Sequence, residues 1–429
     1  VMFDQCKALI IGLQKRGAVV GSSLNTAYLL ERLSQTLERL ETLMAIFVSN
    51  RYLPRRILLL TGCFARAAAE RHSISRLWKQ SSGLMARSVT QNAGDHGEHY
   101  ITRDKKEYWA MFYSAAGGGV LIALMALFKT YLGSIIDDKV WKGIAEGLNY
   151  GLGFMVIFML HFTVATKQPA MTAARFAEAV EKTPQGKTVN MKLAQLLVDV
   201  FRSQSIAVLG NVLIAMGLAA LIAFGYQYKT GEPLMNADQI AYQLHSIDPF
   251  AGTLWFAAIA GVWLFCSGII SGYFDNRSNY LNMRMRLTQH PLLKKLMSEK
   301  TRIKFANYMH ENYGSLIGNL CFGMLLGITG VVGYLTHLPL DIRHVAFSSA
   351  NVGYIAVSGH FTYSLLLQCI GFVLLIGLVN LIVSFSLTLW VALRSLNAEI
   401  DSWWPIWHEV CQIVKKRPLS LFLPVQLDK

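Results

Sequence analysis

Six stretches of the chain are apolar over about 20 residues and carry almost no charge. They lie near residues 109–128, 144–165, 205–226, 251–273, 314–335 and 366–393. A run of about 20 apolar residues is what an α-helix needs to cross the hydrocarbon core of a bilayer. Aromatic residues that suit the membrane interface fall near the ends of these stretches; they are Trp109, Tyr113, Trp141, Trp255, Tyr273 and Trp390. The pattern predicts an all-α, polytopic membrane protein with about six transmembrane helices.

The two ends of the chain differ from this membrane domain. Residues 1–108 are rich in Arg, and leucines repeat within them at spacings of three and four. This spacing is typical of an antiparallel helical hairpin or, as the alternative, of an intermolecular coiled coil. We therefore expect a cytoplasmic basic helical region over 1–108, a six-helix domain over 109–393 and a cytoplasmic tail over 394–429. Because Val1 is not an initiator Met, we also expect that the first region is truncated at its N-terminus.

Charge and composition fix the class of protein further. The chain is 53% hydrophobic and 15% charged, with a mean hydropathy of +0.37, which is typical of membrane proteins. The net charge of +14 would also suit nucleic-acid binding, but 35 of the 40 Lys and Arg lie in alternate segments between the apolar stretches. The other segments hold only five, namely Lys129, Lys139, Lys142, Lys229 and Arg343. By the positive-inside rule, this asymmetry predicts a multi-pass protein of the bacterial inner membrane with both termini in the cytoplasm. Nucleic acid is therefore not an expected partner, whereas membrane lipids are.

Small and polar residues recur inside the predicted helices. Gly143, Gly147 and Gly151 share a spacing of four with Gly323 and Gly327, which predicts close helix packing within one bundle or, alternatively, dimerisation into a homo-oligomer. Four asparagines each fall in a different predicted helix; they are Asn149, Asn211, Asn319 and Asn380. Hydrogen bonds between membrane helices contribute about 0.6 kcal/mol on average, so a structural role is expected, with a polar path as the alternative.

The densest cluster of polar groups follows the glycine-rich stretch 314–333. The candidate binding residues there are Asp341, Arg343, His344, Ser348, Ser349 and Asn351. Asp, His and Ser also make up catalytic triads, but no Gly-x-Ser-x-Gly turn accompanies them, so no catalytic residue is predicted. Arg343 is the sole Lys or Arg of its segment, which favours a binding or positioning role. Asp341 and Arg343 could pair or cap a short helix after Pro339, and residues 345–361 could form a re-entrant segment that lines a cavity.

A second polar cluster precedes the first apolar stretch. Asp95, His96, Glu98 and His99 lie close together in the sequence and resemble a metal site. Helical histidine ligands of zinc are four residues apart, whereas these two are three apart, and nearby glycines disfavour a helix. We therefore expect no metal and no cofactor.

Several motifs carry a resemblance to a known family. They are Gly97-Glu-His-Tyr-Ile-Thr-Arg-Asp104, His161-Phe-Thr-Val-Ala-Thr-Lys-Gln-Pro-Ala-Met171, Ser271-Gly-Tyr-Phe-Asp-Asn276, Leu338-Pro-Leu-Asp-Ile-Arg-His-Val-Ala-Phe-Ser-Ser-Ala-Asn351, Gly377-Leu-Val-Asn380 and Ser384-Phe-Ser-Leu387. Over about residues 90–396 the chain resembles the bacterial multi-pass membrane proteins called the site-specific recombinase family. The resemblance implies DNA strand exchange. Tyrosine recombinases, however, need a His-x-x-Arg motif, and no His of this sequence is followed by Arg three residues later.

Three hypotheses for function remain. The first is that the protein binds or moves a small apolar or amphipathic molecule, or a lipid, in a cavity bounded by the fifth and sixth stretches. The second is that it acts as a non-catalytic membrane scaffold or sensor through residues 1–108. The third is that it is a DNA recombinase, which would make it an enzyme, as the family resemblance implies.

Overall fold

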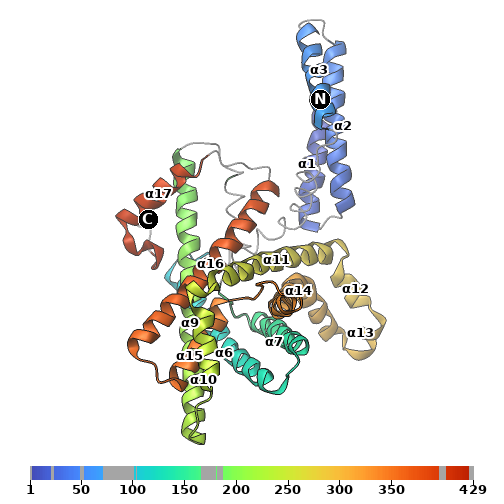
Figure 1. Ribbon diagram of the computed structural model, residues 1–429. Coiled ribbons are helices and arrows are strands. Elements are labelled where there is room, and N and C mark those ends of the chain that lie inside the picture. Colours follow the sequence, from blue (N-terminus) through green and yellow to red (C-terminus); the bar gives the residue numbers. More distant parts are fainter. Residues whose placement is uncertain are drawn as a thin grey trace. The chain divides into compact units, whose positions relative to one another are not determined.

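The computed structural model describes residues 2–20, 24–48, 53–70, 101–102, 104–165, 180, 187–395 and 402–424. All regular secondary structure in these ranges is helical (Figure 1). The contacts divide the chain into two compact units. The first consists of residues 1–92, 272–313 and 394–397, and the second of residues 93–271, 314–393 and 398–429. Three long helices have residues in both units; they are α11 (Thr253–Tyr280), α14 (Glu299–Thr336) and α16 (Tyr363–Ser395).

The first unit contains α1 (Met2–Val20), α2 (Leu24–Val48), α3 (Leu53–Glu70), α12 (Met283–Gln289) and α13 (Pro291–Leu296). Helix α2 packs against α1 and α3 (Figure 1), and an ion pair between Lys7 and Glu41 joins α1 to α2. Leu33, Leu40 and Met44 of the leucine repeat are about half exposed. These three residues therefore do not form a buried interface between α2 and its neighbouring helices.

The second unit contains most of the apolar sequence. Its helices are α6 (Lys105–Ile135), α7 (Lys139–Met159), α9 (Lys187–Thr230), α10 (Ala237–Ile247), α11 (Thr253–Tyr280), α14 (Glu299–Thr336), α15 (Val345–Ser358), α16 (Tyr363–Ser395) and α17 (Trp404–Lys416), with 3-10 turns at Pro249–Ala251 and Pro418–Leu421. In the described part of the chain, α6, α9, α11, α14 and α16 are long and apolar enough to cross a membrane. Large apolar side chains on these helices remain exposed, such as Leu221 and Leu367 at 69% each. The prediction of an all-α, polytopic membrane protein is confirmed.

Helix α7 differs from the predicted second stretch. It has 21 residues, is not among the five apolar helices and ends at Met159, whereas the prediction ran to residue 165. The helix carries Lys139, Lys142 and Glu146, which lower its hydropathy. Past its end, His161 adopts a left-handed backbone conformation, with φ of 58°, and the chain leaves the helix.

Glycines of α7 and α14 bring these two helices into backbone contact. A Cβ atom at Gly323 would overlap the backbone of Gly151, and one at Gly327 would overlap the backbone of Gly147. A Cβ atom at Gly143 would overlap Val331 on α14. In lipid, such small residues allow helices to approach closely and gain dispersion contacts. The repeated spacing thus serves packing within one chain, which was the first of its two predicted roles.

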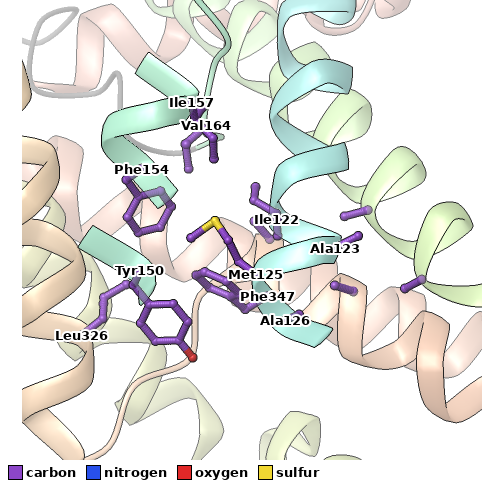
Figure 2. Close-up of a cluster of buried hydrophobic side chains, with 14 of the residues drawn as sticks. Ile122, Ala123, Met125, Ala126, Tyr150, Phe154, Ile157, Val164, Leu326 and Phe347 are labelled. Atoms are coloured by element: carbon purple, nitrogen blue, oxygen red, sulfur yellow. The ribbon is translucent and has the colours of Figure 1, made fainter. Parts of the chain in front are cut away.

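The side chains beside this helix pair form the main apolar core. Figure 2 shows Tyr150 and Phe154 of α7 pointing toward Phe347 of α15 and Met125 of α6. The rings of Tyr150 and Phe347 have centroids 4.4 Å apart. This core fixes the α7 and α15 segments from which the polar site is built.

Candidate functional site

Two of the four predicted intramembrane asparagines hold irregular backbone in place. Asn380 on α16 is fully buried; its Nδ2 donates to the carbonyls of Ala257 (2.7 Å) and Arg343 (3.0 Å), and its Oδ1 accepts from the Val345 N–H (3.1 Å). Buried backbone that is not helical needs such partners, because no water or helical neighbour satisfies it. Asn380 therefore fixes the segment that runs into α15.

Asn211 on α9 does the same for the segment after α7. Its Nδ2 donates to the carbonyls of Ala115 and Thr163, and its Oδ1 accepts from the Ala165 N–H at 2.7 Å. The other two asparagines make simpler bonds, from Asn149 to the Met125 carbonyl (2.9 Å) and from Asn319 to the Ser315 carbonyl (2.7 Å). Each of the four asparagines thus donates to at least one backbone carbonyl, which is what a structural role requires.

The predicted binding residues divide into a buried group and a cavity group. His344, Ser348 and Ser349 are buried at the start of α15, at most 5% exposed, and Ser349 donates to its own helix at the Ala346 carbonyl. These side chains belong to the packing of α15. Asp341, Arg343 and Asn351 instead line a cavity.

His344 is the N-cap of α15, which therefore begins at Val345 and not directly after Pro339. Its Nδ1 accepts from the Ala346 N–H at 3.4 Å, and its ring lies among the rings of Phe154, Phe322 and Phe347. Burial among these rings lowers the pKa of His344 to about 4, because an imidazolium would lose its hydration there. The imidazole is thus held neutral as a structural cap.

The cavity has a volume of about 420 Å³, which lies in the range of small-molecule sites. Its wall comes from the end of α6, the first half of α7, α10 with the two residues before it, the C-terminal third of α14, residues 341–343 and α15. Among the described residues, none of α16 lines it. This cavity is lined by α14 and the loop after it, on the side of the fifth stretch, whereas the sixth stretch, α16, supports the loop through Asn380 and α10 covers the cavity.

Most charges of the cavity wall are paired. Lys129 Nζ lies 3.4 Å from Glu146 Oε2 and 5.6 Å from the ring centroid of Tyr150. Arg343 Nη1 lies 2.6 Å from Asp341 Oδ2, so the pairing considered for these two residues is present.

Further bonds fix the side of the cavity next to α10. Arg343 Nε donates to the Ser246 carbonyl at 2.8 Å, and the guanidinium lies 5.4 Å from the ring centroid of Phe256. Asn351 Nδ2 donates to Gln243 Oε1 on α10 at 3.0 Å. Arg343 of the predicted loop and Asn351 of α15 thus hydrogen-bond to α10. The hydropathy pattern did not indicate that α10 forms part of the cavity wall.

Sequence reasoning missed several wall residues on other elements: Lys129, Lys142, Glu146, Tyr150, Asp238 and Tyr242. One signal could have found two of them. Of the five Lys and Arg in the cation-poor segments, Lys129, Lys142 and Arg343 all line this one cavity. The metal-like cluster at residues 95–99 lies outside the described residues.

The fold and this cavity define the chain as an all-α polytopic membrane protein with a charged cavity at one end of its helix bundle. A family model described as "Site-specific recombinase" matches residues 1–424, so the chain belongs to that family. The match thus extends well beyond the resemblance over about residues 90–396, and it includes the first helices of the chain. No curated protein and no solved structure matches the chain significantly.

Proposed function

We propose that the protein binds the polar end of an amphipathic small molecule or lipid in the cavity between α6, α7, α10 and α14. The supporting observation is the concentration of charge. Three of the five cations in the cation-poor segments meet there, and they come from positions as distant as 129 and 343. Charged groups in the membrane part of a protein are energetically costly, so those that are present mark binding or transport sites by default.

The chemistry of the wall favours an amphipathic ligand over a purely apolar one. The wall combines six ionisable carboxylate, ammonium and guanidinium groups with apolar surface from Met235, Leu326 and Ile342. Sites of this kind fix the orientation of a ligand through a few polar groups and bury its apolar part. We also propose an inner-membrane location with both termini in the cytoplasm, because 35 of the 40 Lys and Arg lie in the segments that this orientation places inside.

Filling the cavity tests this proposal. Gly330 on α14 lines the cavity, and a Cβ atom there would meet only Asp341 Oδ1, at 3.9 Å. The substitution Gly330→Phe should therefore place a ring in the cavity without disturbing helix packing. Gly371→Phe on α16 is the matched control, because Gly371 is exposed and has no atom within 4 Å of such a Cβ.

The readout is labelling of the purified full chain by a photoactivatable phospholipid, with the labelled peptides identified by mass spectrometry. We expect labelling of the cavity peptides in the wild type and in Gly371→Phe, and its loss in Gly330→Phe. Equal labelling of the cavity peptides in all three proteins would contradict the proposal.

Family membership supports a second candidate, site-specific DNA recombination. This function requires the basic region to hold DNA through its phosphates, with an affinity that falls steeply as salt increases. A titration of the full chain with duplex DNA at low and high salt tests it. Failure to bind DNA at low salt would remove this candidate.

A further inference from the structure

Two charged side chains of the cavity stand apart from the paired ones. Lys129 pairs with Glu146, and Arg343 pairs with Asp341. Lys142 and Asp238 also line the cavity, but neither forms an ion pair with any residue in the described ranges. As far as the described residues go, the wall thus keeps one unpaired cation and one unpaired anion.

The position of Lys142 is not explained by helix stability. It lies in the second turn of α7, near the positive end of the helix dipole, where a cation is not favoured. Its ammonium reaches across to α6, because a Cβ atom at Gly133 would lie 3.1 Å from Lys142 Nζ. Gly133 itself lines the cavity, so the glycine leaves room for the ammonium at the cavity wall. A cation at a helix start is well placed to receive an anion such as a phosphate.

Asp238 supplies the opposite charge from another element. It lies in the first turn of α10, whose start is fixed by a capping box between Asn236 and Gln239. Both capping residues also line the cavity. The capping bonds hold the first turn of α10 in place, and with it the backbone that carries the Asp238 carboxylate.

We propose that this cavity selects a zwitterionic headgroup, with its phosphate against Lys142 and its ammonium against Asp238. The inference rests on the proposed function. The three cations and three carboxylates of the wall balance, so a ligand with both charges keeps the cavity neutral, whereas an anionic headgroup leaves Asp238 facing like charge. The chemical class is a phosphate linked to a primary amine, as in an ethanolamine phospholipid or in free phosphoethanolamine.

The test uses displacement of the photoactivatable phospholipid from the purified full chain in detergent micelles. The competitors are phosphatidylethanolamine and phosphatidylglycerol with identical acyl chains, and soluble phosphoethanolamine. We expect the ethanolamine lipid to displace the probe from the wild type at lower concentration than the glycerol lipid. Lys142→Gln should weaken both lipids, and Asp238→Asn should weaken only the ethanolamine lipid, each by about fivefold for a partly exposed ion pair.

A charge exchange separates a specific pairing from a general loss of structure. The double variant Lys142→Asp with Asp238→Lys should bind soluble phosphoethanolamine more tightly than either single exchange, because this molecule has no acyl chains and can reverse its orientation. Equal displacement by the two lipids in the wild type, or the same loss for both lipids in Asp238→Asn, would overturn the inference.

Failure of the proposed function gives a different result. In that case neither lipid would displace the probe from the wild type more readily than from Gly330→Phe. Displacement by phosphoethanolamine as well as by the ethanolamine lipid would support headgroup selection with the free phosphoamine as a sufficient ligand. Displacement by the lipid but not by phosphoethanolamine would support it with the lipid as ligand.

Discussion

Replacing Asn380 by Leu tests whether this side chain holds the cavity loop in place in addition to stabilising the helix bundle. Asn380 is fully buried and makes three hydrogen bonds, to the Ala257 and Arg343 carbonyls and from the Val345 N–H. At about 0.6 kcal/mol for each bond in a membrane protein, their loss costs roughly 2 kcal/mol. The Arg343 carbonyl and the Val345 N–H also lose partners outside a helix, which adds about 1–3 kcal/mol if they stay buried. We expect a total loss of roughly 3–5 kcal/mol in the free energy of unfolding.

Asn211→Leu provides the matched control. Asn211 is equally buried and also holds irregular backbone through three bonds, at Ala115, Thr163 and Ala165. Within the described structure it neither lines the cavity nor hydrogen-bonds to residues 341–345. It should cost a similar free energy of unfolding. Only Asn380→Leu should also release Arg343 from its position and weaken lipid labelling of the cavity.

The assay combines two measurements on each full-length variant. Unfolding in mixed micelles of increasing sodium dodecyl sulfate content, followed by tryptophan fluorescence, gives the free energy of unfolding. Photolabelling under native conditions gives cavity binding. An Asn380→Leu variant as stable as the wild type, or an equal loss of cavity labelling in Asn211→Leu, would contradict this role of Asn380.

Two further predictions concern packing and pH. Gly327→Leu should destabilise the bundle by about 1–3 kcal/mol or more, because the new side chain would overlap the backbone of α7 at Gly147. Thermal unfolding should show this loss, and an unfolding midpoint equal to that of Gly371→Leu would argue against the close helix contact. The pKa of His344 is about 4 in the folded protein, whereas the ordinary value is 6.5, so between these pH values the unfolded chain binds one proton more than the folded chain. The free energy of unfolding should therefore be unaffected by His344 above pH 6.5 and should fall by about 3 kcal/mol as the pH is lowered toward 4. Between pH 4 and 6.5 the free energy of unfolding should depend less on pH in His344→Asn, because Asn keeps an N-cap acceptor that does not titrate. A pH profile identical to that of the wild type would show that His344 does not cause the pH dependence.

Much of the fold could be predicted from the sequence because lipid imposes a simple rule. An apolar run that crosses a bilayer must satisfy its own backbone, so it forms a helix wherever it is long enough. The prediction was least accurate at α7, where the helix ends at Met159 and the chain continues through Thr163 and Ala165 without helical bonds. That ending depends on Asn211, 46 residues away from Ala165, and no local pattern contains it.

The candidate site shows the same division. The polar segment around Asp341 and Arg343 could be found from the sequence alone, and so could the scarcity of Lys and Arg in the segments on that side of the membrane domain. Only the tertiary structure decided that Lys129, Glu146 and Asp238 join them around one cavity, while His344 and Ser349 turn into the core. Hydropathy records whether a residue suits lipid or water, and this is a property of each segment alone. The pairing of charges depends on distances of a few ångströms between helices, which are set by the glycine contacts of α7 with α14 and by the asparagine that fixes the loop.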